Sequence, residues 1–239
     1  MCTTALSAQR LVSGLDDIIR ESENTSLLRA GLRMTKPDRA YVGMNTLYGM
    51  LLKRTNQQEF VLLSGMPDLF EGRVKTFLTQ SQFPAVEIKL RNLFTEWSIV
   101  NFKMKKVDEL IEQNEQMLIF VVDNSETSLN FASELMKKYP RRVARIYLRQ
   151  TIKREVPAGM IPFVTPLEIA LHELKNGNLS NRDVKQLLSE LENEKDAEKL
   201  IPAWSYCPVD FEPCQGGIFE TCTSFTDKIR SICRSRETK

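Results

Sequence analysis

Strong charge of one sign and long apolar runs are both missing from this sequence. The formal net charge is only +2 over 239 residues, so no overall field favours nucleic acid as a partner. The longest apolar stretches, such as residues 117–122, are strand-sized and far too short to span a bilayer. Residues 1–9 contain no basic flank followed by a long apolar run. We therefore expect no cleavable secretory signal, no transmembrane segment and an intracellular, cytoplasmic protein.

Ligands for a transition metal are also scarce. The single histidine, His172, has no partner nearby in the sequence, and we interpret it as a surface or core residue. Four of the five cysteines lie late, at Cys207, Cys214, Cys222 and Cys233, without any Cys-x-x-Cys pair. That spacing disfavours a structural zinc site. An odd cysteine count without a signal peptide favours a reducing compartment, so we expect free, buried thiols.

What the sequence does contain is an alternation of short apolar runs and longer amphipathic segments. The apolar runs predict strands at residues 11–15, 59–64, 86–90, 117–123 and 143–148. Their continuous Val, Ile, Leu and Phe content is typical of strands buried on both faces, as in a parallel sheet. The amphipathic segments predict helices at residues 68–79, 103–113 and 128–138. This alternation indicates βαβ crossovers and therefore an α/β fold with a doubly wound parallel sheet and flanking helices.

The pattern changes towards the end of the chain. After Thr165 it predicts helices at residues 167–174 and 181–191, and the charged run 190–199 is interpreted as a solvated continuation of the second. Beyond Pro202 the composition shifts to Cys, Pro, Gly and aromatic residues and ends in basic ones. We therefore divide the chain into an N-terminal extension (1–10), one α/β domain (11–200) and a Cys-containing C-terminal tail (201–239).

Polar side chains follow several of the predicted strands. Asp16 comes after the first strand, Ser64 ends the second, Asp123 ends the fourth, and Lys103 begins the helix before it. Strand ends in a doubly wound sheet converge on one crevice, so these four residues are expected to meet there. Carboxylates suit Mg²⁺, and a lysine with a hydroxyl suits phosphate oxygens. Each residue alone has an ordinary explanation as a turn or solvated surface residue.

Their order and spacing resemble a known family. Residues 11–184 resemble the catalytic domain of the actin-patch-type phosphatidate phosphatases, a branch of the haloacid dehalogenase (HAD-like) superfamily. The family's Asp-x-Asp-Asp-Thr-Ile motif is matched by Gly14-Leu15-Asp16-Asp17-Ile18-Ile19. Further matches are YVGM at 41–44, FVLLSGMP at 60–67, Lys103, VDNSE at 122–126, YPRRV at 139–143, IYLR at 146–149 and TPLEIA at 165–170.

The departures from that family concern its catalytic residues. The resemblance implies an aspartate nucleophile at the position of Gly14, which has no side chain. The general acid is kept as Asp16 and the fourth-motif acid as Asp123, whereas the motif threonine is Ile18 and a later acid is Ser128. The resemblance therefore implies Mg²⁺ as cofactor, bound by Asp16 and Asp123 at a weakened site. Covalent catalysis needs its nucleophile in place, so hydrolysis is expected to be lost.

These residues lead to three functional hypotheses. The favoured one is a catalytically impaired pseudo-phosphatase that binds a protein partner or a phosphorylated (lipid) ligand at Asp16, Ser64, Lys103 and Asp123. The second is an active Mg²⁺-dependent phosphatase on phosphatidate or another phosphomonoester, and the third is a purely structural subunit. The basic tail (Lys228, Arg230, Arg234, Arg236 and Lys239) is expected to be a solvated end, with peripheral membrane contact as the alternative.

The resemblance also predicts that the site can be partly restored. Gly14→Asp would supply the nucleophile, and Ser128→Asp would return the second acid. Both positions are expected to face solvent at strand or loop ends, so neither carboxylate should be buried without a partner. The double variant should therefore bind Mg²⁺ more tightly than the parent chain.

Overall fold

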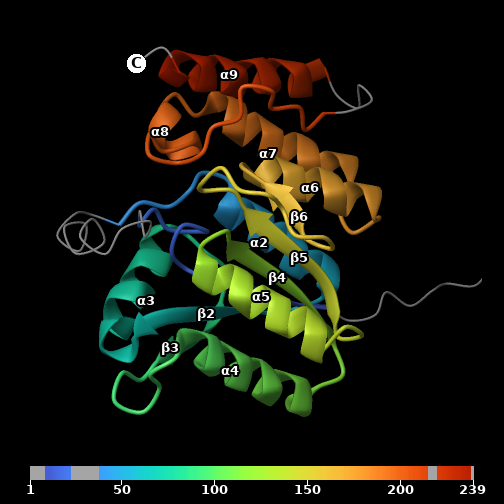
Figure 1. The fold of residues 1–239 in the computed structure, drawn as a ribbon. Helices are drawn as coiled ribbons and strands as arrows, with labels where there is room; N and C mark the ends of the chain where they lie inside the picture. The colour runs from blue at the N-terminus through green and yellow to red at the C-terminus, as the bar shows by residue number, and fades with distance from the viewer. Residues whose placement is uncertain (1–8, 23–37, 215–219, 238–239) are drawn as a thin grey trace, which may run out of the picture.

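The computed structural model describes residues 9–22, 38–214 and 220–237. The expected N-terminal extension therefore lies almost wholly outside the described residues, as does Lys239 of the basic tail. In the described part, six parallel strands form one sheet in the order β3-β2-β1-β4-β5-β6 (Figure 1). The predicted α/β fold with a parallel, doubly wound sheet is confirmed.

The five predicted strands are present, with most ends shifted by one to three residues. They are β1 (Gln9–Ser13), β2 (Phe60–Pro67), β3 (Val86–Arg91), β4 (Met117–Asp123) and β5 (Val143–Arg149). The sixth strand, β6 (Ile161–Phe163), carries little sequence signal because it has three residues and a central proline. It extends the sheet at the edge of β5.

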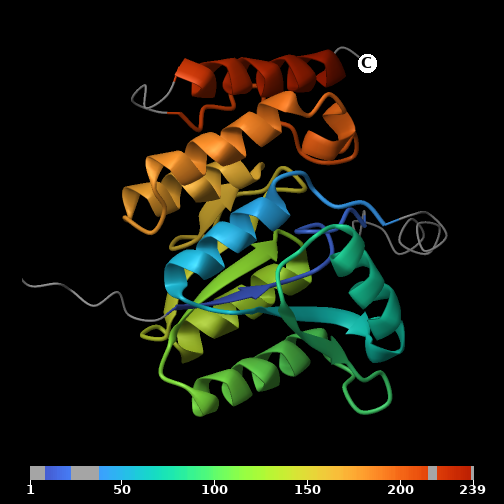
Figure 2. The same cartoon turned by 180° about the vertical axis from the view of Figure 1, so that it is seen from behind.

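Helices cover both faces of the sheet, as the views from opposite sides show (Figures 1 and 2). One face carries α2 (Met44–Thr55) and, after a short 3-10 turn η1 (Asp68–Phe70), α3 (Glu71–Gln80). The other carries α4 (Ile99–Gln113) and α5 (Glu126–Lys138). Alternate residues of β4 belong to two separate cores: Ile119 and Val121 pack towards α2, and Phe120 and Val122 towards α4 and α5. Burial on both faces explains the continuous apolar runs of the strands.

β1 occupies the centre of the sheet and pairs with β2 on one side and β4 on the other. Its Val12 is in register with Val61 of β2 and Phe120 of β4. The predicted adjacency of the first and fourth strands is thus confirmed. Because all strands are parallel, the loops after β1, β2, β3 and β4 leave the sheet from the same edge, where ligand crevices form in such folds.

The C-terminal region stacks beyond β6 as a further layer of helices (Figure 1). These helices are α6 (Pro166–Lys175), α7 (Asn181–Asn193), α8 (Ala197–Leu200) and α9 (Glu220–Glu237). The expectation that residues 190–199 continue the second helix is wrong: α7 ends at Asn193, and α8 is separate. Phe225 and Ile229 of α9 are fully buried in the same cluster as residues of the sheet, so residues on both sides of position 200 share one core.

The cysteines correct a second expectation, since the four late ones are not free thiols. Cys207 is bonded to Cys233, and Cys214 to Cys222. Both bonds fasten α9 to the segment that precedes it, a pairing that depends on three-dimensional proximity and that spacing alone does not give. Disulfides are typical of oxidising compartments, so the cysteine count no longer supports a cytoplasmic location, which stays a prediction. Disulfide sulfurs also offer no thiolate to zinc.

None of the described helices combines the length and apolar character needed to cross a bilayer.

Candidate functional site

A cavity of about 640 Å³ opens at the edge where the strands end. It is bounded by the loop after β1, the ends of β2 and β4, and the first turns of α4 and α5. The residues singled out from the sequence all line it: Gly14, Asp16, Ser64, Lys103, Asp123 and Ser128. The predicted convergence of these side chains is therefore present, while their functional roles stay predictions.

Gly14 lies directly after β1, where its backbone N–H donates to the carbonyl of Val121 at 3.0 Å. A β-carbon added to Gly14 would lie only 2.4 Å from Cδ1 of Ile18. Ile18 is buried, so its side chain takes up the space into which a residue at position 14 would extend. The two departures from the family motif are thus one structural feature, in which the larger residue at 18 occupies the place left by the missing side chain at 14.

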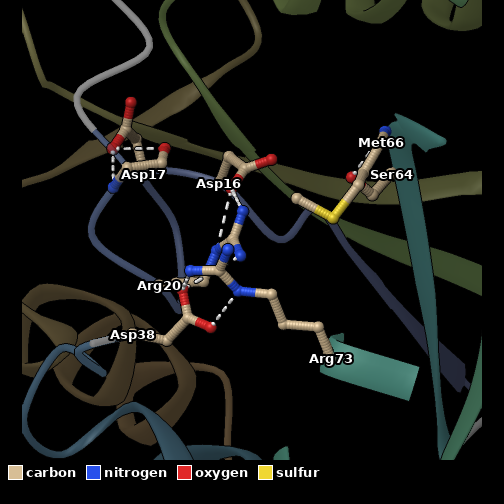
Figure 3. A network of polar contacts seen from close by, with 8 residues as sticks. Asp16, Asp17, Arg20, Asp38, Ser64, Met66 and Arg73 are labelled. Carbon is tan, nitrogen blue, oxygen red and sulfur yellow. Dashed lines mark hydrogen bonds and ion pairs between the residues drawn. The ribbon is translucent and has the colours of Figure 1, made fainter. Parts of the chain in front are cut away.

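Asp16 is engaged by an arginine from its own loop. The Nε of Arg20 donates to Oδ1 of Asp16 at 3.0 Å, and Nη2 of Arg20 forms an ion pair with the same oxygen. Arg20 also contacts Asp38 through Nη1 at 3.2 Å. Figure 3 shows the guanidinium of Arg20 between the two carboxylates. The carboxylate of Asp16 is therefore neutralised within the protein.

The network continues to α3. Nε of Arg73 donates to Oδ2 of Asp38 at 2.8 Å, and Nη2 donates to Oδ1 at 3.0 Å (Figure 3). The hydrogen bond to Asp38 raises the pKa of Arg73, with smaller contributions from the charges of Asp38 and Asp16. Two carboxylates and two guanidinium groups thus balance one another along this wall of the cavity.

Asp17 does not replace the missing nucleophile. It has φ 56°, is buried, and its Oδ1 accepts hydrogen bonds from the backbone N–H and the hydroxyl of Ser22 at 2.8 and 2.9 Å. In Figure 3 the carboxylates of Asp16 and Asp17 point in different directions. Asp17 does not line the cavity. Because β1 ends at Ser13, the turn of the loop with its left-handed residue at position 17, and not the alternation of a strand, directs Asp17 away from the cavity.

The opposite wall holds Ser64 and Lys103. The hydroxyl oxygen of Ser64 accepts the backbone N–H of Met66 at 3.1 Å, which fixes its orientation at the end of β2. Lys103 is buried in the first turns of α4, with Nζ 5.4 Å from the centre of the Phe131 ring. Within the described residues, no hydrogen bond or ion pair satisfies this ammonium group.

Burial lowers the pKa of Lys103 from its usual 10.5, while the charges of Asp123 and then Asp16 counteract this effect. The charged lysine is thus desolvated and feels two carboxylates of the cavity without contacting either. An anion in the cavity would stabilise the charged form of Lys103, because it would supply the hydrogen-bond acceptors that burial has removed.

Asp123 ends β4 with both carboxylate oxygens occupied. Its Oδ1 accepts the backbone N–H of Ser125 at 2.7 Å, and its Oδ2 accepts the hydroxyl of Ser128 at 3.0 Å. Ser128 is only 3% exposed. The expectation that a carboxylate at position 128 would face solvent is therefore wrong, because this position lies in the first turn of α5, under the loop from β4.

The donor set does not fit a magnesium ion as it stands. Mg²⁺ requires about six oxygen ligands in near-octahedral geometry. Here Asp16 is paired with Arg20, and Asp123 accepts hydrogen bonds at both oxygens. Across residues 9–22, 38–214 and 220–237, no group of three or more His, Cys, Asp or Glu side chains could hold a metal.

The ion-pair network in the cavity wall adds three residues that were not selected from the sequence: Arg20, Asp38 and Arg73. A signal existed only for Arg20, which lies four residues after Asp16, a spacing at which opposite charges meet in a compact turn. Asp38 and Arg73 lie 35 positions apart, and no local pattern relates them.

Comparisons with known proteins place the matched region on this part of the fold. The family model "Phosphatidate phosphatase APP1, catalytic domain" matches residues 9–150, from β1 to just past β5. No curated protein and no solved structure gave a match. The family is typically metal-dependent, in contrast with the donor set described above. Because its model covers more than half of the 239 residues, this chain belongs to the family of the phosphatidate phosphatase APP1 catalytic domain.

Proposed function

We propose that this chain is a catalytically impaired member of its family, a pseudo-phosphatase that binds a phosphorylated ligand, specifically a lipid phosphate, in the cavity at the strand ends. The observation that carries the proposal is the pair Gly14 and Ile18. The residue at the nucleophile position has no side chain, and the isoleucine occupies the adjacent space.

The loss of chemistry is supported by the groups around that pair. A covalent phosphoryl intermediate needs a nucleophile at the strand end, and its removal costs several orders of magnitude in rate. Asp17 is turned towards Ser22 and lies outside the cavity. Asp16, at the general-acid position, is engaged in an ion pair with Arg20.

The retention of binding is supported by the opposite wall. Lys103 brings a desolvated positive charge, and the Ser64 hydroxyl can donate its proton because its oxygen already accepts from Met66. Both groups recognise phosphate oxygens. Apolar side chains of Leu63, Met66 and Ile99 line the same cavity, which favours a phosphate carried by an apolar molecule over inorganic phosphate.

Two measurements on the full chain test this proposal. Purified protein is incubated with para-nitrophenyl phosphate and with phosphatidate at millimolar Mg²⁺, and binding of a short-chain, water-soluble phosphatidate is measured by calorimetry. We expect binding without turnover above the background of buffer alone. Robust turnover that disappears in both Asp16→Asn and Asp123→Asn would instead establish an active Mg²⁺-dependent phosphatase.

Absence of both turnover and binding would leave a structural role, or a role in binding a protein partner, and would refute the ligand-binding proposal. Lys103→Met removes the ammonium group of the cavity and should weaken this binding. Lys106→Met is its matched control, because Lys106 also lies on α4 but pairs with Glu109 outside the cavity. The control should bind the soluble phosphatidate as the parent chain does.

A further inference from the structure

The exposed large apolar side chains of the described residues all gather at one place. They are Leu69, Leu93, Phe94 and Trp97, with exposed fractions of 66%, 38%, 88% and 85%. Leu69 belongs to η1, and the other three to the loop of residues 92–98 between β3 and α4. We call these two segments, residues 68–70 and 92–98, the apolar tip. Single exposed apolar residues are common, whereas the largest cluster of them on a monomer is often functional.

The apolar tip adjoins the cavity. β3 ends at the same edge of the sheet as β1, β2 and β4, and the loop that follows it projects beyond α3 and β2 in both views (Figures 1 and 2). Phe70 next to Leu69, and Ile99 just after the loop, both line the cavity. An apolar surface therefore runs from the projecting loop to the mouth of the cavity that contains Lys103.

The loop is held in one shape by its own hydrogen bonds. The backbone N–H groups of Asn92 and Phe94 donate to the side chains of Glu96 and Asn92, at 2.9 and 3.0 Å. Arg91 donates to the carbonyls of Glu96 and Trp97 at 3.3 and 3.1 Å. Asn92 also donates to Asp68 at 2.9 Å and so joins the loop to η1. Backbone groups that are paired in this way need no hydrogen bond from water, while the carboxylates of Asp68 and Glu96 keep their place at the level of the polar headgroups.

We infer that the apolar tip is a membrane-docking element that enters the interfacial region of a lipid bilayer and brings the cavity mouth to the lipid headgroups. This inference rests on the proposed function, since it says how a lipid phosphate would reach the site. Trp97 and Phe94 are suited to this position, because tryptophan and other aromatic side chains favour the boundary between headgroups and acyl chains.

The size and shape of the surface favour a bilayer over a protein partner. Four partly exposed side chains present on the order of 500 Å², whereas a stable protein interface buries about 800 Å² on each partner. The surface is a projecting turn and offers no groove to a peptide. Insertion of a few aromatic and aliphatic side chains is instead enough for reversible binding to a lipid interface.

Of the four basic tail residues that the structure describes, Lys228, Arg230 and Arg236 have partners within the protein, and Arg234 is exposed. Lys228 donates to the carbonyls of Leu191, Glu192 and Glu194, and Arg236 donates to those of Pro202 and Ile201. These side chains are committed to contacts within the protein. We therefore assign peripheral membrane contact, which the sequence left as an alternative for the tail, to the apolar tip, at the opposite end of the sheet from α9 (Figure 1).

Tryptophan fluorescence offers a direct test, because the sequence has only two tryptophans, Trp97 and Trp204. In Trp204→Phe, the emission of Trp97 should shift to shorter wavelength on addition of phosphatidylcholine vesicles that contain phosphatidate, and brominated acyl chains should quench it. In Trp97→Phe, the remaining signal from Trp204 should not change. Unchanged emission of Trp97 at saturating lipid would refute the inference.

Vesicle flotation then separates the tip from the cavity. Phe94→Ser with Trp97→Ser should weaken partition onto vesicles about tenfold or more, as expected for two aromatic side chains. Its binding of soluble short-chain phosphatidate should be unchanged. Arg182→Ser with Gln186→Ser is the matched control, since both residues are exposed on α7, and it should float like the parent chain.

The two proposals fail in different ways. Vesicle binding with insertion of Trp97, but no binding of soluble phosphatidate, would retain the docking tip and refute the proposed function. Binding of soluble phosphatidate with no flotation, or flotation unaffected by the Phe94 and Trp97 changes, would refute the docking tip. Self-association that depends on these two residues, without flotation, would also refute it and point to a second copy as the partner.

Discussion

Cationic side chains at the two ends of the molecule have different surroundings. At the cavity, Lys103 is buried without a hydrogen bond or ion pair among the described residues, and its pKa is lowered. In α9, Lys228 donates to three backbone carbonyls, and Arg230 pairs with Glu212. An unsatisfied buried charge costs stability, whereas a satisfied one supports the fold.

The carbonyls that Lys228 contacts belong to the end of α7 and the residues just after it. Carbonyl groups at the C-terminal end of a helix have no partner within the helix, and they carry the negative end of its dipole. Lys228 donates hydrogen bonds to these carbonyls and places a positive charge at the negative end of the dipole, and it thereby attaches α9 to α7. The charge of Lys228 therefore stabilises the fold, whereas the charge of Lys103 remains available to a ligand.

The largest expected effect concerns the disulfides that hold α9. Cys207→Ala with Cys233→Ala should lower the free energy of unfolding by about 3 kcal/mol, because the bond closes a loop of 26 residues. The same change at Cys214 and Cys222, which are 8 residues apart, should cost about 1 kcal/mol less. Urea unfolding with and without reductant measures both. Equal losses of unfolding free energy in the two variants would contradict the effect of loop length. Reduced binding of soluble phosphatidate would show that α9 affects the ligand site.

The second effect concerns ligand binding alone. Lys103→Met should weaken binding of short-chain phosphatidate about thirtyfold, or about 2 kcal/mol, as expected for loss of a charge-assisted hydrogen bond. Stability should not fall, since the change removes a buried charge that lacks a partner. Calorimetry and urea unfolding give the two values. Loss of stability with unchanged binding would show that Lys103 serves the fold.

The lowered pKa of Lys103 adds a pH dependence to this test. Binding needs the charged lysine, so affinity should fall as the pH rises through its lowered pKa, below the usual 10.5. Above about pH 8 the phosphate group is already fully ionised and adds no change of its own. The free energy of unfolding should rise over the same pH range, because deprotonation of Lys103 removes a desolvated charge from the folded state. Lys103→Arg should keep its affinity across this range, since arginine stays charged.

A smaller effect is expected at the other end of the molecule. Lys228→Met should lower the free energy of unfolding by about 1–2 kcal/mol, because carbonyls at the end of α7 lose a charged donor. Binding of soluble phosphatidate should not change. Lys105→Met, on the exposed face of α4, controls for the loss of a positive charge. A loss of affinity in Lys228→Met would mean that the two regions are coupled.

Much of the sheet was predictable because burial on both faces leaves a strong local signal. The run at β4 has the predicted bounds, and polar residues at the ends of parallel strands had to converge. The signal for α9 was weaker, because its apolar residues Phe225, Ile229 and Cys233 are separated by Ser, Thr and Arg. Their spacing of four residues nevertheless indicates one helix face.

The parts of the site that were not predictable depend on contacts between distant residues. Arg20 and Arg73 meet at Asp38, across 18 and 35 positions of sequence. The contact of Ile18 with the space at Gly14 depends on a rotamer, and the disulfide pairs depend on how α9 packs. The residues that the fold brings together could therefore be predicted from the sequence. Which of their charges are neutralised by ion pairs could not.

The smallest expected effect is restoration of a metal site. Gly14→Asp alone would press the new side chain against Cδ1 of Ile18, the end of a side chain that can shift, and Ile18→Thr removes this contact. Ser128→Asp replaces a hydroxyl that donates to Asp123 at 3.0 Å with a second carboxylate, in a position that is 3% exposed. The carboxylate of Asp123 and a buried one at position 128 would repel each other, and a divalent cation would relieve this repulsion. The triple variant should therefore be less stable than the parent in the presence of a chelator and should regain stability with millimolar Mg²⁺, which does not stabilise the parent. Asp16 stays paired with Arg20, so we expect the gain to be modest and turnover to remain absent.

Thermal unfolding with Mg²⁺ and with chelator measures the difference. A folded triple variant that is indifferent to Mg²⁺ would show that the three side chains do not converge, and that the family's metal site cannot be transferred to these positions.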